Sequence, residues 1–192
     1  TLSEVVEDVT SRVNQAKSEA AANGAELLRN DATILTHDYS STVLEAIELA
    51  ARAGQHLTVY VTEARPRYLG RKTARTLASI DRVATTLLTD AACVEVLDKC
   101  DRVVVGMDCI VDDIFYNRVG TFPIAATAAE LAVPMHALGA SSKVIESGGF
   151  AFENEFRPTS EVMREPAEGF EVTKPAYDAT PTHLLTSVIT DK

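Results

Sequence analysis

The sequence is poor in cysteine and contains no long apolar run. Its three cysteines, Cys93, Cys100 and Cys109, form no C-x-x-C pair and follow no secretory segment. We therefore expect neither a zinc site nor a disulfide framework, and the reduced cytoplasm is the predicted location. No apolar run approaches the roughly 20 residues that cross a bilayer, so we expect a protein without a membrane segment.

Basic residues are scarce, and lysine is the scarcer of the two types. The chain has 18 Lys and Arg against 28 Asp and Glu, which gives a net charge of −10. A field of this sign repels polyanions, so direct binding of nucleic acid is not expected. An acidic surface poor in lysine suits a cytoplasm of high salt, and a stability curve without a salt requirement would contradict this halophilic interpretation.

The length and the balance of residue types predict one packed domain. The chain has 192 residues, of which 46% are hydrophobic and 24% are charged. We expect an N-terminal helical segment over residues 1–30, followed by an α/β domain over residues 31–192. Apolar residues at helical spacing form a stripe on the first helix, which needs a cover: Leu2, Val5, Val9, Val13 and Ala16.

Strand and helix patterns alternate after residue 31. This alternation predicts a doubly wound, mainly parallel, Rossmann-like sheet with helices on both faces. Asp90 is a candidate N-cap. The expected strands are 32–36, 57–62, 83–89, 102–105 and 134–138, and the expected helices are 42–53, 73–79, 91–97 and 123–131.

Residues 147–174 lack a sustained period and are rich in Gly, Glu, Phe and Pro. We expect aromatic side chains to anchor this segment, either on the edge of its own domain, which is the favoured interpretation, or over a groove or a neighbouring subunit. A short helix and a strand are expected within residues 183–190. The aromatic side chains are Phe150, Phe152, Phe156 and Phe170.

Ligands of open parallel sheets bind beyond the carboxyl ends of the strands, where helix N-termini present free N–H groups. Polar stretches fall at four such places: residues 37–41, 63–66, 106–108 and 175–180. Residues 117–121 also predict a tight turn that leads into a helix.

Each polar residue has a plain structural alternative when it is taken alone. Asp108 can cap a helix, His37 can order its own loop, and Arg65 can bridge to Glu63. Together, however, Arg65 and Arg118 can neutralise phosphate, the N–H groups near Gly120 and Thr121 can cradle it, and Asp108 can move a proton.

Other known catalytic and ligand-binding motifs are missing from the sequence. It has no dinucleotide fingerprint, Walker loop, nucleophile elbow or H-E-x-x-H motif. Its four histidines lack metal-ligand spacing, so neither a metal nor a cofactor is expected. Cys109 next to Asp108 is either a nucleophile or a buried small hydrophobe, and the second interpretation is favoured.

Five strings occur in the order and spacing of one protein family. They are Ile34-Leu35-Thr36-His37, Val61-Thr62-Glu63-Ala64-Arg65-Pro66, Val104-Val105-Gly106-Met107-Asp108, Asn117-Arg118-Val119-Gly120-Thr121 and Pro175-Ala176-Tyr177-Asp178-Ala179-Thr180-Pro181. The chain thereby resembles, from residue 31 onward, the family of the alpha, beta and delta regulatory subunits of initiation factor 2B. Ribose-1,5-bisphosphate isomerase and methylthioribose-1-phosphate isomerase belong to the same family.

In the isomerases of this family, the resemblance implies conversion of a phosphorylated aldose to a ketose by a cysteine and an aspartate. The aspartate falls on Asp108, but the cysteine position holds Asp38. The lysine of the family turn is here Arg118, which keeps the charge with a different donor geometry. Family members also begin with a larger helical domain, so we expect a short form, a fragment, or a cover supplied by a partner.

Three functions follow from these residues. The first is a regulatory, oligomeric protein that binds a sugar phosphate or nucleotide, with a homodimer or higher oligomer and a translation-initiation partner as expectations. The second is an aldose-ketose isomerase in which Asp38 replaces the cysteine opposite Asp108. The third is a structural subunit without a small-molecule site. The ligand-binding residues expected in the first case are Arg65, Asn117, Arg118, Gly120, Thr121, His37 and Asp178, together with Asp108.

Overall fold

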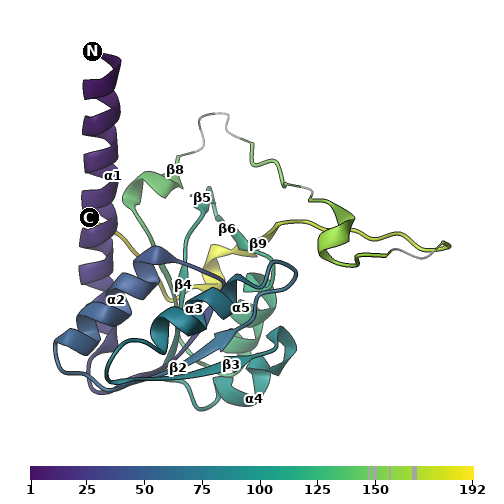
Figure 1. The fold of residues 1–192 in the computed structure, drawn as a ribbon, viewed down its shortest axis with the longest axis horizontal. Helices are drawn as coiled ribbons and strands as arrows, with labels where there is room; N and C mark the ends of the chain where they lie inside the picture. The colour runs from purple at the N-terminus through teal and green to yellow at the C-terminus, as the bar shows by residue number, and fades with distance from the viewer. Residues whose placement is uncertain (147, 149–150, 156, 166–167) are drawn as a thin grey trace.

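The computed structural model describes residues 1–146, 148, 151–155, 157–165 and 168–192. Its main sheet has six strands in the order β10-β7-β4-β1-β2-β3, and all neighbouring pairs are parallel. The predicted doubly wound, parallel α/β fold is therefore confirmed (Figure 1). The strands are β1 (Thr33–His37), β2 (Leu57–Thr62), β3 (Val83–Leu88), β4 (Arg102–Gly106), β7 (Met135–Leu138) and β10 (Ser187–Ile189).

Helices cover both faces of this sheet because successive strand side chains point to opposite sides. Ile34 packs in a core cluster with α1 and α2, whereas its neighbour Leu35 packs in a second cluster with α4 and α5. Both strand side chains are fully buried. The helices are α1 (Leu2–Ala25), α2 (Ser41–Arg52), α3 (Leu69–Leu77), α4 (Val94–Leu97) and α5 (Thr121–Glu130).

Helix α1 belongs to the core only through its C-terminal half. Thr1 and Glu4 form a capping box at its start. Ala20, Ala21 and Gly24 are buried, but residues 1–15 are exposed, and Leu2 is 82% exposed. Figure 1 shows the first half of the helix rising beyond the sheet. The predicted apolar stripe thus has no cover in the described chain, and the boundary at residue 30 stays a prediction.

A second, smaller sheet was not expected from the sequence. Its order is β8-β5-β6-β9, with β5 and β6 forming a hairpin. Residues 119–120 form the predicted turn into α5, whereas residues 117–118 end one strand of this sheet and residues 177–181 form another. Two of its strands have only two or three residues, and the other two carry polar residues such as Arg118 and Asp178 in place of an apolar run. They are β5 (Cys109–Val111), β6 (Ile114–Arg118), β8 (Val144–Ile145) and β9 (Tyr177–Pro181).

The aromatic anchoring of residues 147–174 is confirmed at one described position. The ring of Phe152 stacks on Tyr116, with centroids 3.8 Å apart, and meets Tyr177 edge-on at 5.5 Å. Phe170 is instead 52% exposed. The other two aromatic residues of the prediction, Phe150 and Phe156, lie outside the described residues.

Asp90 does not cap the helix that follows it, so this prediction was wrong. It begins a short 3-10 helix (Asp90–Cys93), and its carboxylate accepts hydrogen bonds of 2.7 Å from the backbone N–H groups of Ala64 and Arg65. Asp90 therefore holds the loop after β2.

The expected elements near the C-terminus are present. A 3-10 helix (Thr182–Leu184) precedes β10. Further 3-10 helices are Glu26–Leu28, Ser141–Lys143 and Thr159–Glu161. In the part of the chain that the structure describes, no helix is both long and apolar enough to span a bilayer.

Candidate functional site

The candidate site lies where the chain changes direction across the sheet. From β1 the chain builds β2 and β3 on one side, and then returns to form β4 on the other side. Loops that follow neighbouring strands diverge at such a switch point and leave a crevice. Asp38 directly follows β1 and Asp108 follows β4, and both line an open pocket of about 240 Å³.

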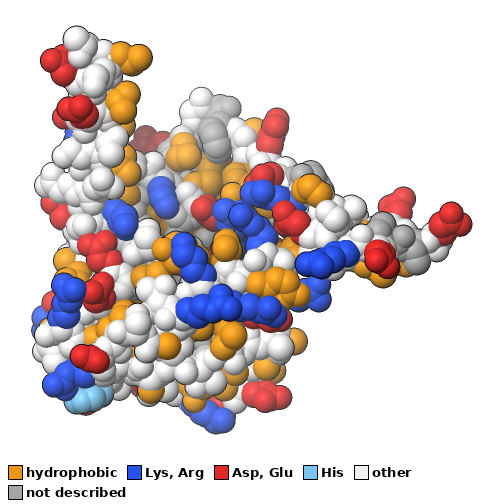
Figure 2. Space-filling model, viewed as in Figure 1, with side chains coloured by type: hydrophobic (Ala, Val, Ile, Leu, Met, Phe, Trp, Pro, Cys, Tyr) orange, Lys and Arg blue, Asp and Glu red, His pale blue; other side chains and the backbone are white. Residues whose placement is uncertain are grey.

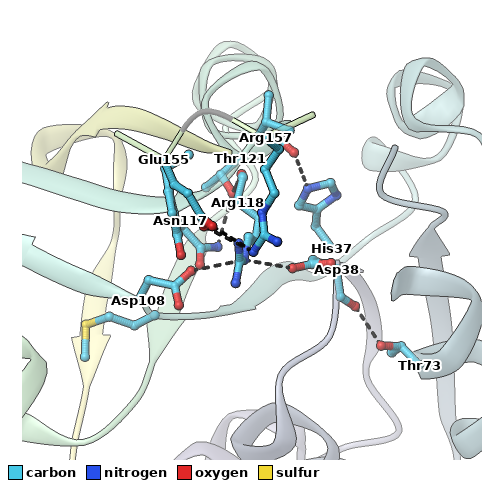
Figure 3. Close-up of polar contacts among 12 residues, drawn as sticks. His37, Asp38, Thr73, Asp108, Asn117, Arg118, Thr121, Glu155 and Arg157 are labelled. Atoms are coloured by element: carbon cyan, nitrogen blue, oxygen red, sulfur yellow. Dashed lines mark hydrogen bonds and ion pairs between the residues drawn. The ribbon is translucent and has the colours of Figure 1, made fainter. Parts of the chain in front are cut away.

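Arg118 joins the two carboxylates (Figure 3). Its Nε lies 3.6 Å from Oδ2 of Asp38 and 3.6 Å from Oδ2 of Asp108. The guanidinium also lies 4.6 Å from the centre of the Tyr177 ring, while its buried Nη1 has no hydrogen-bond partner among the described residues. The predicted site residues Asp38 and Asp108, which follow separate strands, therefore both lie against the guanidinium of Arg118.

Asp38 is the buried member of the carboxylate pair. It is only 7% exposed, its φ of 62° is rare for a residue with a side chain, and Thr73 of α3 donates a hydrogen bond to its carbonyl. Burial raises the pKa of Asp38, and the charge of Arg118 opposes this rise only in part. The pair thus has one carboxyl that holds its proton more tightly than an ordinary aspartate does.

His37 is buried and engages both ring nitrogens. Nε2 lies 2.8 Å from the carbonyl oxygen of Val119, and Nδ1 lies 2.6 Å from Oγ1 of Thr62. Since a carbonyl only accepts, Nε2 carries a proton, and Nδ1 shares a hydrogen bond with the threonine hydroxyl. This geometry corresponds to the loop-ordering role, and ligand contact by His37 stays a prediction.

The turn into α5 is held by its own side chains. Nδ2 of Asn117 donates to Oγ1 of Thr121 at 3.1 Å, and that hydroxyl donates to the carbonyl of Arg118 at 2.6 Å. Gly120 has a φ of 104°, and a Cβ there would lie 2.7 Å from the His37 ring. The predicted turn residues therefore shape the backbone that carries Arg118.

Asp178 occupies the N-terminus of α5. Its Oδ2 accepts hydrogen bonds from the N–H groups of Gly120 at 2.8 Å and Phe122 at 3.0 Å. β9 brings it there because Asp178 pairs with Asn117 of β6. The amide of Gly120, which the sequence suggested as part of a phosphate cradle, is thus already bound to a carboxylate, as in ordinary capping.

Arg65 lines a second, narrow pocket of about 20 Å³. It does not bridge to Glu63, the structural alternative for this arginine. Glu63 pairs with Arg71 at 2.7 Å, while Nη2 of Arg65 donates to the carbonyl of Val162 at 3.0 Å. Asp38 and Arg118 line both pockets, which are therefore adjacent. The cations around the smaller pocket are Arg65, Arg67, Arg118, Arg157 and Lys174.

Three of these cations, Arg67, Arg157 and Lys174, were not singled out from the sequence. Arg157 and Lys174 lie in residues 147–174, the segment without a sustained period. The sequence shows that these residues are basic but does not indicate where their side chains lie in space. Figure 2 shows Lys and Arg side chains gathered across the middle of this face, although the chain as a whole is acidic. The local field at the site is therefore opposite in sign to the net charge.

Lys143 borders the larger pocket, and Cys109 follows Asp108 in the chain. Lys143, also missed, donates from Nζ to the carbonyl of Met107 at 2.6 Å and adds another cation. Burial, followed by the nearby Asp108, raises the pKa of the Cys109 thiol, which disfavours a thiolate nucleophile. Among the described residues, no group of three His, Cys, Asp or Glu could hold a metal ion.

The fold and the site define a class of α/β proteins with a crevice bordered by cations at the switch point of a parallel sheet. Within that class the sequence profile of the Initiation factor 2 subunit family matches residues 1–192. The chain belongs to this family.

Relatives in sequence carry two kinds of name. Ribose 1,5-bisphosphate isomerase of Haloferax volcanii is 30% identical over 193 residues, which covers 97% of this chain and 59% of the relative. The enzyme of the same name from Methanocaldococcus jannaschii is 33% identical, covering 88% and 56%. A putative translation initiation factor eIF-2B subunit 2-like protein of Pyrococcus furiosus is 29% identical, covering 96% and 65%.

Solved structures show the same fold. The translation initiation factor eIF-2B of Pyrococcus horikoshii OT3 superimposes with a TM-score of 0.80 at 27% identity, covering 96% of this chain and 65% of that one. The 5-methylthioribose 1-phosphate isomerase of the same organism gives 0.82 at 26% identity, covering 97% and 58%. The chain thus spans less than two thirds of the length of each relative named here.

Proposed function

We propose that the chain binds a phosphorylated aldose beside Arg118 and converts it to the ketose through Asp38 and Asp108. The observation that carries the proposal is the meeting of these two carboxylates, from separate strands, at 3.6 Å from one guanidinium nitrogen. Relatives named as isomerases of ribose 1,5-bisphosphate and methylthioribose 1-phosphate favour turnover over binding alone.

The two carboxylates suit different roles in this conversion. Asp38, whose pKa is raised by burial, donates its proton to the ring oxygen as the bond between that oxygen and C1 breaks. Asp108, which is more exposed, removes the proton on C2, and the electrons of the C–H bond form the C1–C2 double bond of an enol. The ionised Asp38 then takes the proton of the C2 hydroxyl, the protonated Asp108 gives its proton to C1, and the ketose results with both carboxyl groups back in their starting states.

Arg118 and the cations around it supply the electrostatic part. A fixed guanidinium stabilises the negative charge that develops on the enol oxygen, because it needs no reorganisation during the reaction. Arg65 and its neighbours provide a positive pocket beside the pair, which suits a phosphate group. The reaction only moves protons within one molecule, so it needs no oxidant or reductant.

The direct test is to incubate the purified protein with ribose 1,5-bisphosphate and with methylthioribose 1-phosphate and to measure ketose formation. We expect turnover that falls at least about 100-fold in Asp38→Asn and in Asp108→Asn, as is typical when a general acid or base is removed. Asp112→Asn is the matched control, because Asp112 is exposed in the β5–β6 turn. Ligand binding without turnover of either sugar would contradict the proposal.

A regulatory protein that binds the ligand without turnover is the second candidate. The position of the family's cysteine, by the resemblance, holds Asp38, and one relative is named as a putative initiation factor subunit. In this function the same cations bind a sugar phosphate or nucleotide, and a homodimer or a translation-initiation partner responds to the ligated state. Calorimetry with both sugar phosphates and a nucleotide, combined with the turnover assay, separates the two candidates.

A further inference from the structure

Lys174 is a buried cation outside the Asp38–Arg118–Asp108 cluster. It is 4% exposed, and its Nζ contacts Oε2 of Glu161. Burial, together with the charges of Arg157 and Arg67, lowers the pKa of Lys174. A buried ammonium among other cations is costly unless an anion accompanies it, and in the described chain that anion is a carboxylate from Glu161.

The hydrogen-bonding capacity around this pair is not used up. Apart from their mutual contact, Nζ of Lys174 and Oε2 of Glu161 have no hydrogen-bond partner among the described residues. Nε of Arg157 is also buried without a partner in the same set. The ammonium of Lys174 has three donors, and one carboxylate oxygen of Glu161 satisfies only part of them. The guanidinium of Arg157 has five donors, of which Nη2 pairs with the carboxylate of Glu155 at 3.1 Å, so donors of both cations remain for a further anion.

Glu161 approaches this pocket from the side of a short 3-10 helix (Thr159–Glu161). One residue further on, the carbonyl of Val162 accepts the hydrogen bond from Arg65. The segment is thus attached at two adjacent points, both of them to cations that line the second, narrow pocket. Both attachments use groups that a phosphate oxygen can replace.

We propose that Arg67, Arg157 and Lys174 form a subsite for a phosphate dianion, which Glu161 occupies in the unliganded chain and leaves when phosphate enters. A dianion with several acceptor oxygens can accept hydrogen bonds from N–H groups of these cations that the carboxylate of Glu161 does not contact. The inference deepens the proposed function, on which it rests for the ligand being a sugar phosphate. The affinity for the anion itself does not depend on turnover.

The exchange makes a quantitative prediction. A ligand that binds only when Glu161 has moved away shows an affinity reduced by the fraction of chains in that state. Removing the charge of Glu161 therefore raises the affinity for phosphate, while removing a cation of the subsite lowers it. A purely structural ion pair gives a different result, because its loss would weaken the fold without raising affinity.

The test is calorimetry with inorganic pyrophosphate and inorganic phosphate as probes. We expect Glu161→Gln to raise the affinity about 10-fold, which corresponds to an opened fraction near one tenth in the parent chain. Glu171→Gln is the matched control, since Glu171 is an exposed carboxylate of the same segment. An unchanged or lower affinity in a folded Glu161→Gln variant would overturn the proposal.

A second variant covers the case in which Glu161→Gln does not fold. Arg67 is exposed, so Arg67→Ala leaves the core untouched and is expected to lower the phosphate affinity at least about 5-fold, as loss of a charged hydrogen bond implies. Arg75→Ala on α3, also exposed, is its control. Equal phosphate affinity in the two arginine variants would overturn the proposal.

Failure of this inference is distinguishable from failure of the proposed function. If the chain turns over the sugar phosphate but the Glu161 and Arg67 substitutions leave its phosphate affinity unchanged, the subsite is refuted and the isomerase proposal is not affected. A chain without turnover, in which Glu161→Gln nevertheless tightens phosphate binding, would support the subsite and refute the isomerase.

Discussion

Asp38 concentrates the chemistry of the site in one residue. Its carboxyl is buried, it is linked to the carboxylate of Asp108 through their shared arginine, and burial raises its pKa. A raised pKa means that the folded chain holds this proton more tightly than the unfolded chain does. The same property that suits a general acid therefore also affects stability.

We predict that Asp38 makes the protein less stable as the pH rises above the ordinary aspartate value of 3.8. Between that value and the raised folded pKa, the folded state binds more protons than the unfolded state, so the free energy of unfolding falls with increasing pH. Urea denaturation from about pH 3.5 to about pH 7.5 should show wild type losing stability relative to Asp38→Asn. Asp81→Asn, at an exposed position, is the control, and parallel curves for wild type and Asp38→Asn would refute the prediction.

At the scale of elements, the approach of β1 to the turn before α5 sets the position of Arg118. Gly120 permits this approach because it has no Cβ to meet His37 and because it adopts a left-handed φ of 104° without steric cost. The histidine in turn binds the carbonyl of Val119. A strand end and a helix start are thus fixed to each other at one point.

We predict that Gly120→Ala destabilises the protein by about 1–3 kcal/mol. The alanine must adopt a left-handed φ, and its Cβ would lie 2.7 Å from the ring of His37. Gly54→Ala is the matched control, because Gly54 has a similar φ of 99° with no atom near its Cβ position. Chemical denaturation measures both. Equal losses in the free energy of unfolding for the two substitutions would contradict the prediction.

At the scale of the whole molecule, the first half of α1 stands apart from the α/β body (Figure 1). Its apolar side chains remain exposed in the described chain: Leu2, Val5, Val6, Val9 and Val13. A stripe of this kind is typical of a contact surface, and the sequence already predicted a homodimer or higher oligomer on this ground.

We predict that Val9→Lys combined with Val13→Lys shifts the protein from an associated state toward the monomer. Both side chains are half exposed, so the free energy of unfolding of the monomer should change by less than about 0.5 kcal/mol. Light scattering measures the mass, and Thr10→Lys, on the same helix, serves as the control for added charge. A wild-type protein that is monomeric at high concentration would contradict the prediction.

The sequence by itself determined the main sheet, because most of its strands are short apolar runs and the helices between them are amphipathic. It also identified Asp38 and Asp108 as candidates through their places after strands and Arg118 through the predicted turn, and the family resemblance added the catalytic role of Asp38. The small sheet was not predicted because β5 and β8 have only three and two residues, and β6 and β9 carry polar residues in place of an apolar run.

Only the tertiary structure decided which polar groups are free. The structure shows that His37 binds the carbonyl of Val119 and that Asp178 caps α5, while their contact with a ligand stays a prediction. Arg67, Arg157 and Lys174 were not singled out from the sequence, yet they line one pocket with Arg65. The physical reason is that hydrogen bonds and charge clusters between distant segments depend on distance in space, which no local pattern encodes.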